Sequence, residues 1–381
     1  MTQNFFAPCP RGLEAVLVEE LTTLGAQFVK ATEGGVRFEG DWSLCYRANL
    51  HSRIASRILW RVAQGNYHTE QNIYDTVYAL PWGDWFDVTR TIRVNLAAIK
   101  CPLKSLDFIT LKIKDAVCDK FRELCGERPS VDTHDPDIRI HAFLEHSHMM
   151  LYVDTSGQAL FKRGVRQYTN IAPLRENLAA GILHLAGWKP GMPLLDPMCG
   201  SGTFLIEAAM MWLHIAPGIE RSFAFEKLKN FDAVVWQKLR AEAKAAQLPV
   251  TELPIYGSDL FGDELKAAHL NLENAGLRPA VMLNQANVLE ISAPEESGVL
   301  VANLPYGERM GELQELAELY PKLGDLLKRK FGGWNAYLFT ADLRLAKLIR
   351  LSASKRTPLF NGALECRLFE YKIVAGSNRP K

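Results

Sequence analysis

The stretch "LLDPMCGSGTFLIEAA", residues 194–209, decides the fold of the second part of this chain. An apolar run ends at Asp196, a turn with Gly200 and Gly202 follows, and a helical apolar pattern begins at once. Glycine lets a ligand approach the backbone closely, and the N–H groups at a helix start form a polar ligand site. Such a turn at the carboxyl end of a parallel strand is the usual ligand position in open α/β sheets. The stretch therefore predicts a strand, a ligand-binding turn and a helix.

The ligand of this turn is expected to carry positive charge. The run G-S-G-T-F-L lacks the third glycine of the G-x-G-x-x-G dinucleotide fingerprint. The Asp196 carboxylate would repel a pyrophosphate, but it suits the amino group or the sulfonium of S-adenosylmethionine. The alternative interpretation is a plain strand-to-helix turn with a capping acid, since glycine turns of this kind are common.

Two later strand ends carry side chains that suit the same ligand and a flat base. "PIYGSDL" predicts a strand that ends in Asp259, whose carboxylate would accept hydrogen bonds from ribose hydroxyls. The spacing from Asp196 to Asp259 is much longer than the ~20 residues between the turn and the acid in the compact dinucleotide motif. A helical insertion at 217–252 would explain the difference. "VANLPYGERM" follows the apolar strand "GVLVAN". Without the two acids before it in the expected order, this third motif would read as an ordinary proline loop.

The motif Asn303-Leu304-Pro305-Tyr306 has a use on an exocyclic amine. The lone pair of such an amine is delocalised into the ring, so the nitrogen is a poor nucleophile. The Asn303 side-chain oxygen and the Leu304 carbonyl would accept hydrogen bonds from its N–H groups and push the lone pair toward a methyl donor. Tyr306 would stack on the base. The reaction is then mostly a matter of positioning.

Strand and helix patterns alternate from about residue 172, which predicts a parallel sheet with helices on both faces. At the end of the chain, "LECRLFEYKIV" after Asn361-Gly362 predicts an antiparallel hairpin with "IRLSASKR", residues 349–356. The candidate strands of the parallel part are 193–196, 254–258, 281–285, 298–302 and 335–340.

The first part of the chain reads as α+β. "RGLEAVLVEELTTLG", residues 11–25, predicts a helix closed by Gly25, and "GGVRFEG" predicts a short strand. Residues 137–157 predict a hairpin that turns near Glu145 to Ser147. The aromatic residues of "YALPWGDWF" are expected in the core. A basic link places the main domain boundary around residue 165.

The overall composition excludes several classes of protein. With 44 Lys+Arg and 43 Asp+Glu, bulk charge does not indicate a nucleic-acid binder, so any phosphate contacts must come from local clusters. No apolar run has the length of a membrane span, no signal peptide is expected, and the scattered cysteines predict neither a metal site nor disulfides. We therefore expect a soluble, cytoplasmic protein. Candidate phosphate contacts, which could equally be solvated surface charges, are Arg53, Arg57, Arg61, Lys162, Arg163 and Arg166. The first three recur every four residues and would share a face if the preceding helix extends that far.

These motifs together resemble the class I S-adenosylmethionine-dependent methyltransferases that act on exocyclic amines. "DPMCGSGTFLIEAA" is similar to the cofactor turn of the RNA guanine-N2 subgroup, and "NLPY" to the [DNS]-P-P-Y catalytic motif. "RGLEAVLVEELTTLGA", "GGVRFEG", "PDIRIHAFL" and "LYVDTSGQALFKRGVR" resemble the THUMP-containing half of these enzymes, and "APLRENLAAGIL" their entry helix. Over nearly the whole chain, the sequence is similar to the N-terminal half of the bacterial ribosomal RNA large-subunit methyltransferase K/L family.

The resemblance implies an α/β fold: a class I, Rossmann-like methyltransferase sheet with a C-terminal antiparallel hairpin, preceded by an α+β ferredoxin-like and THUMP region. It implies three domains: an N-terminal ferredoxin-like part at 1–55, a THUMP RNA-docking domain at 56–165 and the methyltransferase domain at 166–381. It also implies methyl transfer from S-adenosylmethionine to N2 of a guanine in 23S rRNA, with structured RNA or a ribosome precursor as partner and no metal. The implied cofactor residues are Asp196, Pro197, Cys199, Gly200, Ser201, Gly202, Asp259 and Asn287, and the implied catalytic residues are Asn303, Leu304, Pro305 and Tyr306.

The sequence departs from the family pattern at three points. Leu304 stands where related enzymes have proline, and Asn287 stands where they usually have aspartate near the adenine amine, although an amide oxygen can also accept that bond. The chain ends at Lys381, without the half that the fused family members use for 7-methylguanine, so a single modification is expected. Two alternatives remain: methylation of a guanine or adenine amine in tRNA, and a catalytically idle RNA-binding or assembly factor.

Overall fold

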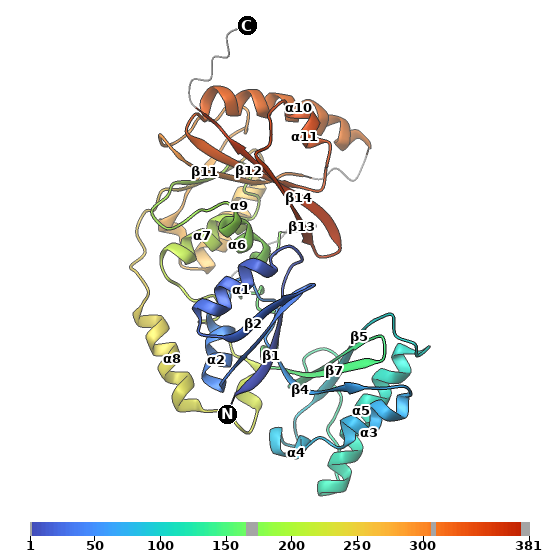
Figure 1. Ribbon diagram of the computed structural model, residues 1–381. Helices are drawn as coiled ribbons and strands as arrows, with labels where there is room; N and C mark the ends of the chain where they lie inside the picture. Colours follow the sequence, from blue (N-terminus) through green and yellow to red (C-terminus); the bar gives the residue numbers. More distant parts are fainter. Residues whose placement is uncertain (1, 165–173, 306–309, 375–381) are drawn as a thin grey trace. The chain divides into compact units, whose positions relative to one another are not determined.

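The computed structural model describes residues 2–164, 174–305 and 310–374, and the chain divides into two compact units (Figure 1). Unit 1 comprises residues 1–8, 18–160 and 221–241. Unit 2 comprises residues 9–17, 161–220 and 242–381. The polypeptide therefore passes between the units several times, and each unit is built from segments that are far apart in the sequence.

Unit 1 is built around a seven-stranded sheet of order β2-β3-β1-β4-β7-β6-β5. Its strands are β1 (Gln3–Pro8), β2 (Gln27–Thr32), β3 (Gly35–Gly40), β4 (Leu59–Asn66), β5 (Ile92–Ile99), β6 (Ile138–Glu145) and β7 (His148–Asp154). Its helical elements are α2 (Trp42–His51), α3 (Glu70–Tyr78), α4 (Trp82–Trp85), α5 (Leu106–Cys125) and η1 (Ala224–Lys227), while α1 (Glu14–Thr23) and α8 (Ala233–Ala245) each run from one unit into the other.

The α+β prediction for this part of the chain is confirmed. Strand β4 joins two halves of the sheet, because it pairs with β1 on one side and with β7 on the other. The hairpin β6–β7 turns at residues 146–147, as expected. Gly25 follows the end of α1 in the left-handed region with φ of 94°, where glycine is favoured. Trp82 and Phe86 are fully buried, as expected, whereas Trp85, whose ring packs against Trp82, and Tyr78 are only half-buried.

The predicted common helical face of Arg53, Arg57 and Arg61 is wrong. Helix α2 ends at His51, and Arg61 lies in strand β4. A half-buried carboxylate, Glu20, explains the end of the helix: it accepts hydrogen bonds from the Ser52 hydroxyl, at 2.9 Å, and from the backbone N–H of Arg53. Burial raises the pKa of Glu20. The chain after His51 is thus held by a tertiary contact in a non-helical conformation.

The segment 221–241, which the sequence assigns to a helical insertion between two strands of the later domain, is part of unit 1. It contains η1 and the start of α8, and its aromatic side chains pack around Tyr46 of α2. The ring of Phe225 lies 4.5 Å from that of Tyr46 and 5.1 Å from that of Trp236. The backbone N–H of Phe225 also donates to the Thr155 carbonyl. The insertion is therefore anchored by a buried aromatic cluster.

We expect Phe225→Ala to destabilise unit 1 strongly. Phe225 is fully buried, and removing a buried phenylalanine ring costs about 3–5 kcal/mol through lost burial and the cavity left behind. The measurement is urea unfolding, with hydrogen exchange used to assign the loss to unit 1. The control is Val234→Ala in the same segment, because Val234 is 78% exposed and its truncation should change stability by less than about 0.5 kcal/mol. Equal unfolding midpoints for the two variants would contradict the anchoring role.

Unit 2 contains a second seven-stranded sheet, of order β10-β9-β8-β11-β12-β14-β13. Its strands are β8 (Leu194–Asp196), β9 (Ile255–Asp259), β10 (Met282–Gln285), β11 (Gly298–Asn303), β12 (Trp334–Thr340), β13 (Lys355–Asn361) and β14 (Leu364–Lys372). Its helical elements are α6 (Glu176–Leu185), α7 (Thr203–Trp212), α9 (Gly262–Asn274), η2 (Arg278–Ala280), α10 (Met310–Lys330) and α11 (Leu345–Leu348).

The mixed sheet of unit 2 confirms the α/β prediction with the C-terminal hairpin. Strands β8 to β12 pair in parallel, whereas β14 inserts antiparallel between β12 and β13. Helices α6 and α7 cover one face and α10 and α11 the other (Figure 1). The first strand of the hairpin begins at Lys355, so most of the predicted partner segment, 349–354, lies outside the strand. The carboxyl ends of five neighbouring parallel strands thus share one edge of the sheet.

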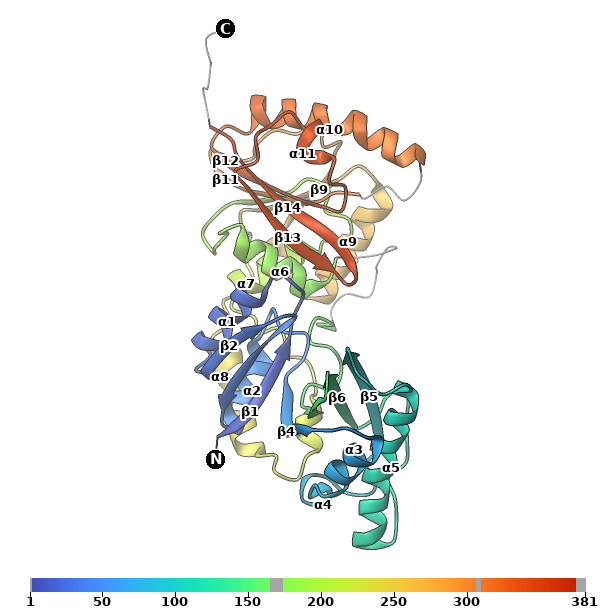
Figure 2. The same cartoon turned by 45° about the vertical axis from the view of Figure 1, so that its right-hand side comes forward.

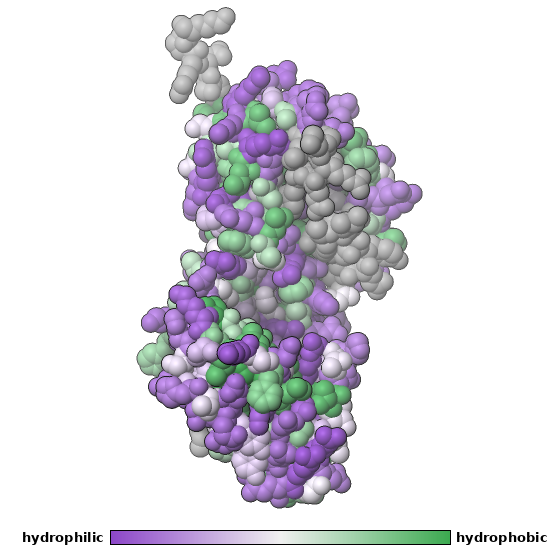
Figure 3. Space-filling view, turned by 90° about the vertical axis from the view of Figure 1, so that its right-hand side faces the viewer, coloured by the Kyte–Doolittle hydropathy of each residue, from purple (hydrophilic) through white to green (hydrophobic). Residues whose placement is uncertain are grey.

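The surface shown in Figure 3 mixes hydrophilic side chains with smaller hydrophobic groups. The exposed large hydrophobic residues include three of helix α5, namely Phe108, Leu111 and Leu124. Within the ranges that the structure describes, no helix combines the length and the hydropathy that crossing a membrane requires.

Candidate active site

The turn after β8 has the backbone shape that its glycines predict. Gly200 and Gly202 have φ of 50° and 83°, a region in which side chains cause strain. A Cβ on Gly202 would lie 3.4 Å from the Cβ of Ala268 on α9. The Cys199 N–H donates to the Ser258 carbonyl, and the Asn271 side chain donates to the Ser201 carbonyl at 3.1 Å. Contacts from β9 and α9 therefore fix the turn between Asp196 and the start of α7.

Two buried carboxylates flank this turn. Asp196 is 2% exposed and accepts a hydrogen bond from the Met198 N–H at 3.2 Å. Asp259 is also buried, and its Oδ2 accepts from the Gly200 N–H at 2.9 Å. Burial raises the pKa of Asp196 well above its usual range, and the nearby charge of Asp259 raises it further. Two buried acids close to each other favour a cationic ligand.

The third predicted group, Asn303, lies at the same edge on the other side of β8. Leu195 of β8 lies beside Leu300 of β11, so Asn303 extends beyond the end of β8, as Asp259 does on β9. Asp259 and Asn303 lie on strands β9 and β11, which are separated by β8. Their backbones are therefore two strand spacings of about 4.8 Å apart, which is roughly the width of a nucleoside. The Leu304 N–H donates to the Phe339 carbonyl at 2.9 Å, which holds the motif against β12.

The other predicted residues at this edge occupy varied environments. Pro197 is buried and Pro305 is exposed, while Tyr306 lies outside the described residues. Asn287 follows β10, and its side-chain oxygen already accepts a hydrogen bond from the Leu289 N–H at 3.0 Å. This bond orders the loop beside Asp259, whose own carbonyl accepts from the Ala286 N–H.

Sequence reasoning missed an apolar feature at this edge. Leu260 and Phe261, directly after Asp259, are 52% and 65% exposed, which is unusual for large apolar side chains next to a ligand turn. The Phe261 N–H donates to the Asp259 side chain at 3.1 Å, and the Leu260 carbonyl accepts from the Gln285 side chain at 3.0 Å. Their position directly after a strand-end acid is the signal that could have identified them.

The predicted phosphate contacts are spread over different environments. Arg57 forms an ion pair with the buried Asp154, and Arg61 donates to the Asn4 side chain at 2.6 Å. Arg53 is half-buried and Lys162 is exposed, while Arg166 lies outside the described residues.

Arg163 differs from the other candidates because it is 3% exposed. Its Nε donates to Glu207 Oε1 at 3.0 Å, in an ion pair whose two side chains are buried. The Arg163 guanidinium neutralises a buried acid of α7 and is not accessible to a ligand in solvent. We therefore do not include Arg163 among the proposed phosphate contacts.

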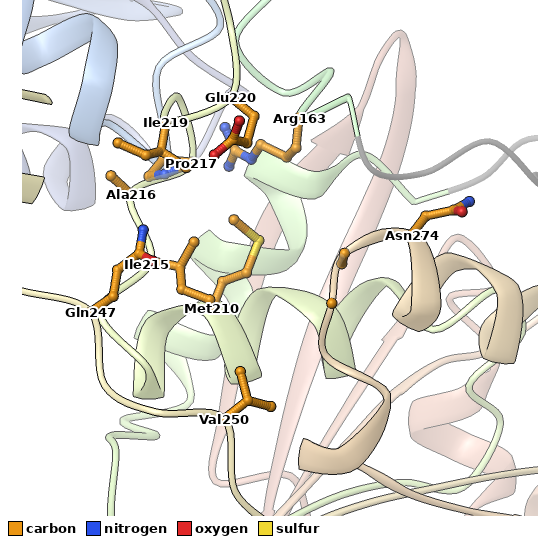
Figure 4. A pocket seen from close by; sticks show the side chains of 12 residues that line it. Arg163, Met210, Ile215, Ala216, Pro217, Ile219, Glu220, Gln247, Val250 and Asn274 are labelled. Atoms are coloured by element: carbon orange, nitrogen blue, oxygen red, sulfur yellow. The ribbon is translucent and has the colours of Figure 1, made fainter. Parts of the chain in front are cut away.

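A separate cavity of about 240 Å³ lies at the far end of α7 from the glycine turn. Figure 4 shows Arg163 and Glu220 at one end of it and Val250 at the other, with Met210 between. Met210 lies about 12 Å along the helix axis from the turn, at 1.5 Å per residue. The cavity includes neither of the two acids nor Asn303, so it is distinct from the candidate active site.

Three known domain families match successive parts of the chain. Residues 4–59 match the RlmL ferredoxin-like domain, residues 67–154 match the THUMP domain, and residues 163–370 match the methyltransferase domain described as RMKL-like. The order of the three domains agrees with the expected one, and the boundaries at 55 and 165 stay a prediction.

Two named relatives cover nearly the whole chain. A ribosomal RNA large subunit methyltransferase K/L from Shewanella baltica is 42% identical over 99% of this chain, which spans 54% of that protein. The chain thus corresponds to about half the length of this relative. A Synechocystis protein with the provisional name RNA methyltransferase slr0064 is 38% identical, over 98% of this chain and 97% of its own length.

A solved structure supports the same assignment. The crystal structure of SMU.472, provisionally described as a methyltransferase and complexed with SAH, is 31% identical and superposes with a TM-score of 0.89 over 98% of this chain and 99% of its own. The family match extends over the glycine turn, both acids and Asn303. The chain therefore belongs to the RMKL-like methyltransferase family, in the form that carries ferredoxin-like and THUMP domains ahead of the methyltransferase domain.

Proposed function

We propose that this protein transfers a methyl group from S-adenosylmethionine to the exocyclic N2 of a guanine in 23S rRNA. The observation that carries the proposal is the convergence of Asp196, Asp259 and Asn303 at one edge of a sheet. The name of the K/L relative supports ribosomal RNA as the substrate class, and the solved relative with SAH supports the cofactor. We further propose that the protein acts in the cytoplasm, where ribosomal RNA is made.

The residues of the turn fit this cofactor. The left-handed glycines leave backbone exposed beside α7, and Asp196 offers a buried negative charge to the amino group or the sulfonium. Asp259 accepts from the ribose hydroxyls, and Leu260 and Phe261 offer apolar surface to the adenine ring. When bound, S-adenosylmethionine supplies an electrophilic methyl group.

The chain's own contribution to methyl transfer is to orient and polarise the amine. Asn303 Oδ1 and the Leu304 carbonyl accept the two N–H groups of the guanine amine, which aims the nitrogen lone pair at the methyl donor. The bond between Leu304 and Phe339 holds this backbone in place. Tyr306 stacks on the base in our proposal, in line with the family motif. A base must leave its stack to reach this position, which costs a few kcal/mol and favours loops, helix ends or partly unfolded RNA.

Cofactor binding is expected to weaken as the pH falls, because Asp196 must be ionised to hold a cation. Because the pKa of Asp196 is raised, cofactor binding should begin to weaken at a higher pH than the range in which an ordinary aspartate titrates. Below that pKa the apparent Kd should rise about tenfold per pH unit, since one proton must leave for each cofactor bound. Calorimetry over a pH series measures the effect.

The Asp196→Asn variant is the control for this pH dependence, and it should bind weakly at every pH. SAH, which lacks the sulfonium charge, distinguishes the two cationic groups of the cofactor. The same pH dependence for SAH indicates that Asp196 holds the amino group. A cofactor affinity that stays constant across the pH series would contradict the proposed role of Asp196.

We propose that the THUMP and ferredoxin-like domains dock structured RNA, with Arg53, Arg57, Arg61, Lys162 and Arg166 among the phosphate contacts. The THUMP match at 67–154 and the named RNA methyltransferase relatives support RNA as the partner. The substrate could be naked 23S rRNA or a ribosome precursor, and methylation assays on both separate these cases.

The test of the whole proposal is a nucleoside comparison by mass spectrometry. 23S rRNA and tRNA are isolated from a strain that lacks this protein and from its parent, then digested. We expect the deletion to remove N2-methylguanine from one position of 23S rRNA and to leave tRNA unchanged. An unchanged 23S rRNA would refute the proposed substrate, and a loss in tRNA instead would identify the tRNA alternative.

A further inference from the structure

A surface of exposed basic side chains follows strand β12 in unit 2. Between Leu343 and Leu364 the sequence contains basic residues but no acidic residue. Since the whole chain carries 44 basic and 43 acidic residues, positive potential can arise only where one sign of charge gathers locally. We call the exposed basic residues of this segment that can share the face of α10 and α11 the β12 basic surface: Arg344, Lys347, Arg350 and Arg356. Lys355 is left out because successive strand residues point to opposite faces of the sheet.

This surface begins at the edge of the sheet that carries the candidate active site. Phe339 of β12 lies beside Asn303 of β11 in the parallel register, and the basic segment starts a few residues beyond Phe339. Lys347 belongs to α11, which contacts α10 (Figure 2). Arg344 and Lys347 are three residues apart at the start of α11, so their Cα positions are separated by about one helical turn.

The innermost member of the surface, Arg344, is held in place by Asp342. The buried Asp342 accepts from Arg344 Nε at 2.9 Å and from Nη2 at 2.7 Å, and it also accepts from the Tyr320 hydroxyl at 3.3 Å. The Arg344 side chain is nevertheless 46% exposed. Because a guanidinium has five N–H donors in a fixed fork, it can bind a second anion while one side is held.

Among the residues described by the structure, no acid forms an ion pair with Lys347, Arg350 or Arg356, the outer members of the surface. Arg350 also has φ of 56°, a left-handed conformation that glycine would adopt at lower cost. The fold thus places an arginine at a position where the backbone favours glycine, which is the kind of strain found at functional sites.

We propose that the β12 basic surface binds the RNA phosphates next to the target nucleotide, as a second RNA contact separate from the THUMP domain. The inference rests on the proposed function, since it takes RNA as the substrate. A base drawn out of its stack brings its own flanking phosphates to the edge of the active site, where the basic segment starts at Arg344, and the cations along this segment release counterions from those phosphates. Phosphate contacts fix the register of a nucleic acid without reading its sequence.

The experiment compares two double variants of the full chain in binding to an in vitro transcript of 23S rRNA. Lys347→Gln with Arg350→Gln removes two charges from the surface. The matched control, Lys189→Gln with Lys244→Gln, removes two exposed charges from other segments of unit 2, and Lys189 precedes β8 at the opposite edge of the sheet. Filter binding over a salt series gives the affinity and its salt dependence.

We expect the surface variant to bind about tenfold more weakly and its salt slope to fall by about 1 to 2, because each removed cation leaves one RNA phosphate without a neutralising partner. The Kd for S-adenosylmethionine should not change, and the control should match the parent protein. Arg350→Gly alone should weaken RNA binding while the Tm stays constant or rises, because glycine relieves the left-handed backbone. This variant separates a loss of charge from a loss of folding.

Equal RNA affinity for the surface variant and the control would overturn the inference. The inference would also be overturned if the surface variant bound the transcript as tightly as the parent protein but methylated ribosome precursor particles less. That result would indicate that the surface contacts a protein of the particle. The proposed function is judged separately, by whether the parent protein forms N2-methylguanine in the same transcript. A parent protein that binds the transcript through this surface but methylates another base would refute only the proposed function.

Discussion

Asn303→Ala should lower the rate of methyl transfer by about a hundredfold to a thousandfold while leaving cofactor binding nearly intact. The side-chain oxygen of Asn303 has no proposed contact with the cofactor, and its hydrogen bond to the amine matters most as the nitrogen becomes nucleophilic. An interaction realised mainly in the transition state affects kcat and kcat/KM together, with little effect on binding. Single-turnover methylation of the 23S rRNA transcript and calorimetry with S-adenosylmethionine give the two quantities.

Asn335→Ala is the matched control for this variant. Asn335→Ala is the same substitution in the neighbouring strand β12. Asn335 lies in register with Val299, near the amino end of β11 and away from the candidate active site. The control should keep full activity. If Asn303→Ala loses cofactor affinity and methylates normally once the cofactor is saturating, Asn303 is a cofactor ligand and the proposed catalytic role is wrong.

Asp259→Ala should weaken cofactor binding by about 30- to 1000-fold. A hydrogen bond to a charged group contributes about 1.5–3 kcal/mol, and Asp259 is proposed to accept from the ribose hydroxyls. The substitution also removes the acceptor for the Gly200 N–H and for the Phe261 N–H, so the turn and the apolar residues beside it lose their order. A total of about 2–4 kcal/mol corresponds to the expected range of Kd.

Calorimetry with S-adenosylmethionine measures this loss, and Asp263→Ala serves as the control. Asp263 is an acid of the following helix whose side chain is 94% exposed and pairs only with the exposed Lys266 among the described residues, so its removal tests the effect of losing an acid near the turn. At saturating cofactor the Asp259→Ala variant should regain much of its methylation rate, because the amine-orienting groups are intact. A Kd within threefold of that of the parent protein would exclude Asp259 as the ribose acceptor.

Much of unit 2 could be predicted because its signals are local. An apolar run that ends in an acid, followed by glycines and a helical pattern, specifies β8, its turn and α7 within a short stretch of chain. The same holds for Asp259 and Asn303, since each directly follows its own apolar strand. Parallel strands then bring such strand ends to a common edge, so their order along the chain already indicates a shared site.

The residues that the sequence misplaced are those whose partners lie far away in the chain. Arg163 and Lys162 are adjacent and look alike in the sequence, yet Arg163 pairs with the buried Glu207 and Lys162 is exposed. Likewise, the spacing of the arginines after α2 suggested one helical face, but contacts with Glu20 end that helix. A charged side chain takes its role from the group that approaches it in three dimensions, and spacing along one segment does not report that group.

The sequence by itself thus determined the α/β and α+β character of the two parts, the strands of the later sheet and the three polar groups at its edge. Only the tertiary structure decided that residues 221–241 join unit 1, that Arg163 is buried, and that Phe339, a few residues before the basic segment, lies beside Asn303. The physical reason is the range of the interactions involved. Hydrophobic periodicity and turn geometry act within a few residues, whereas burial and ion pairing depend on contacts between distant segments.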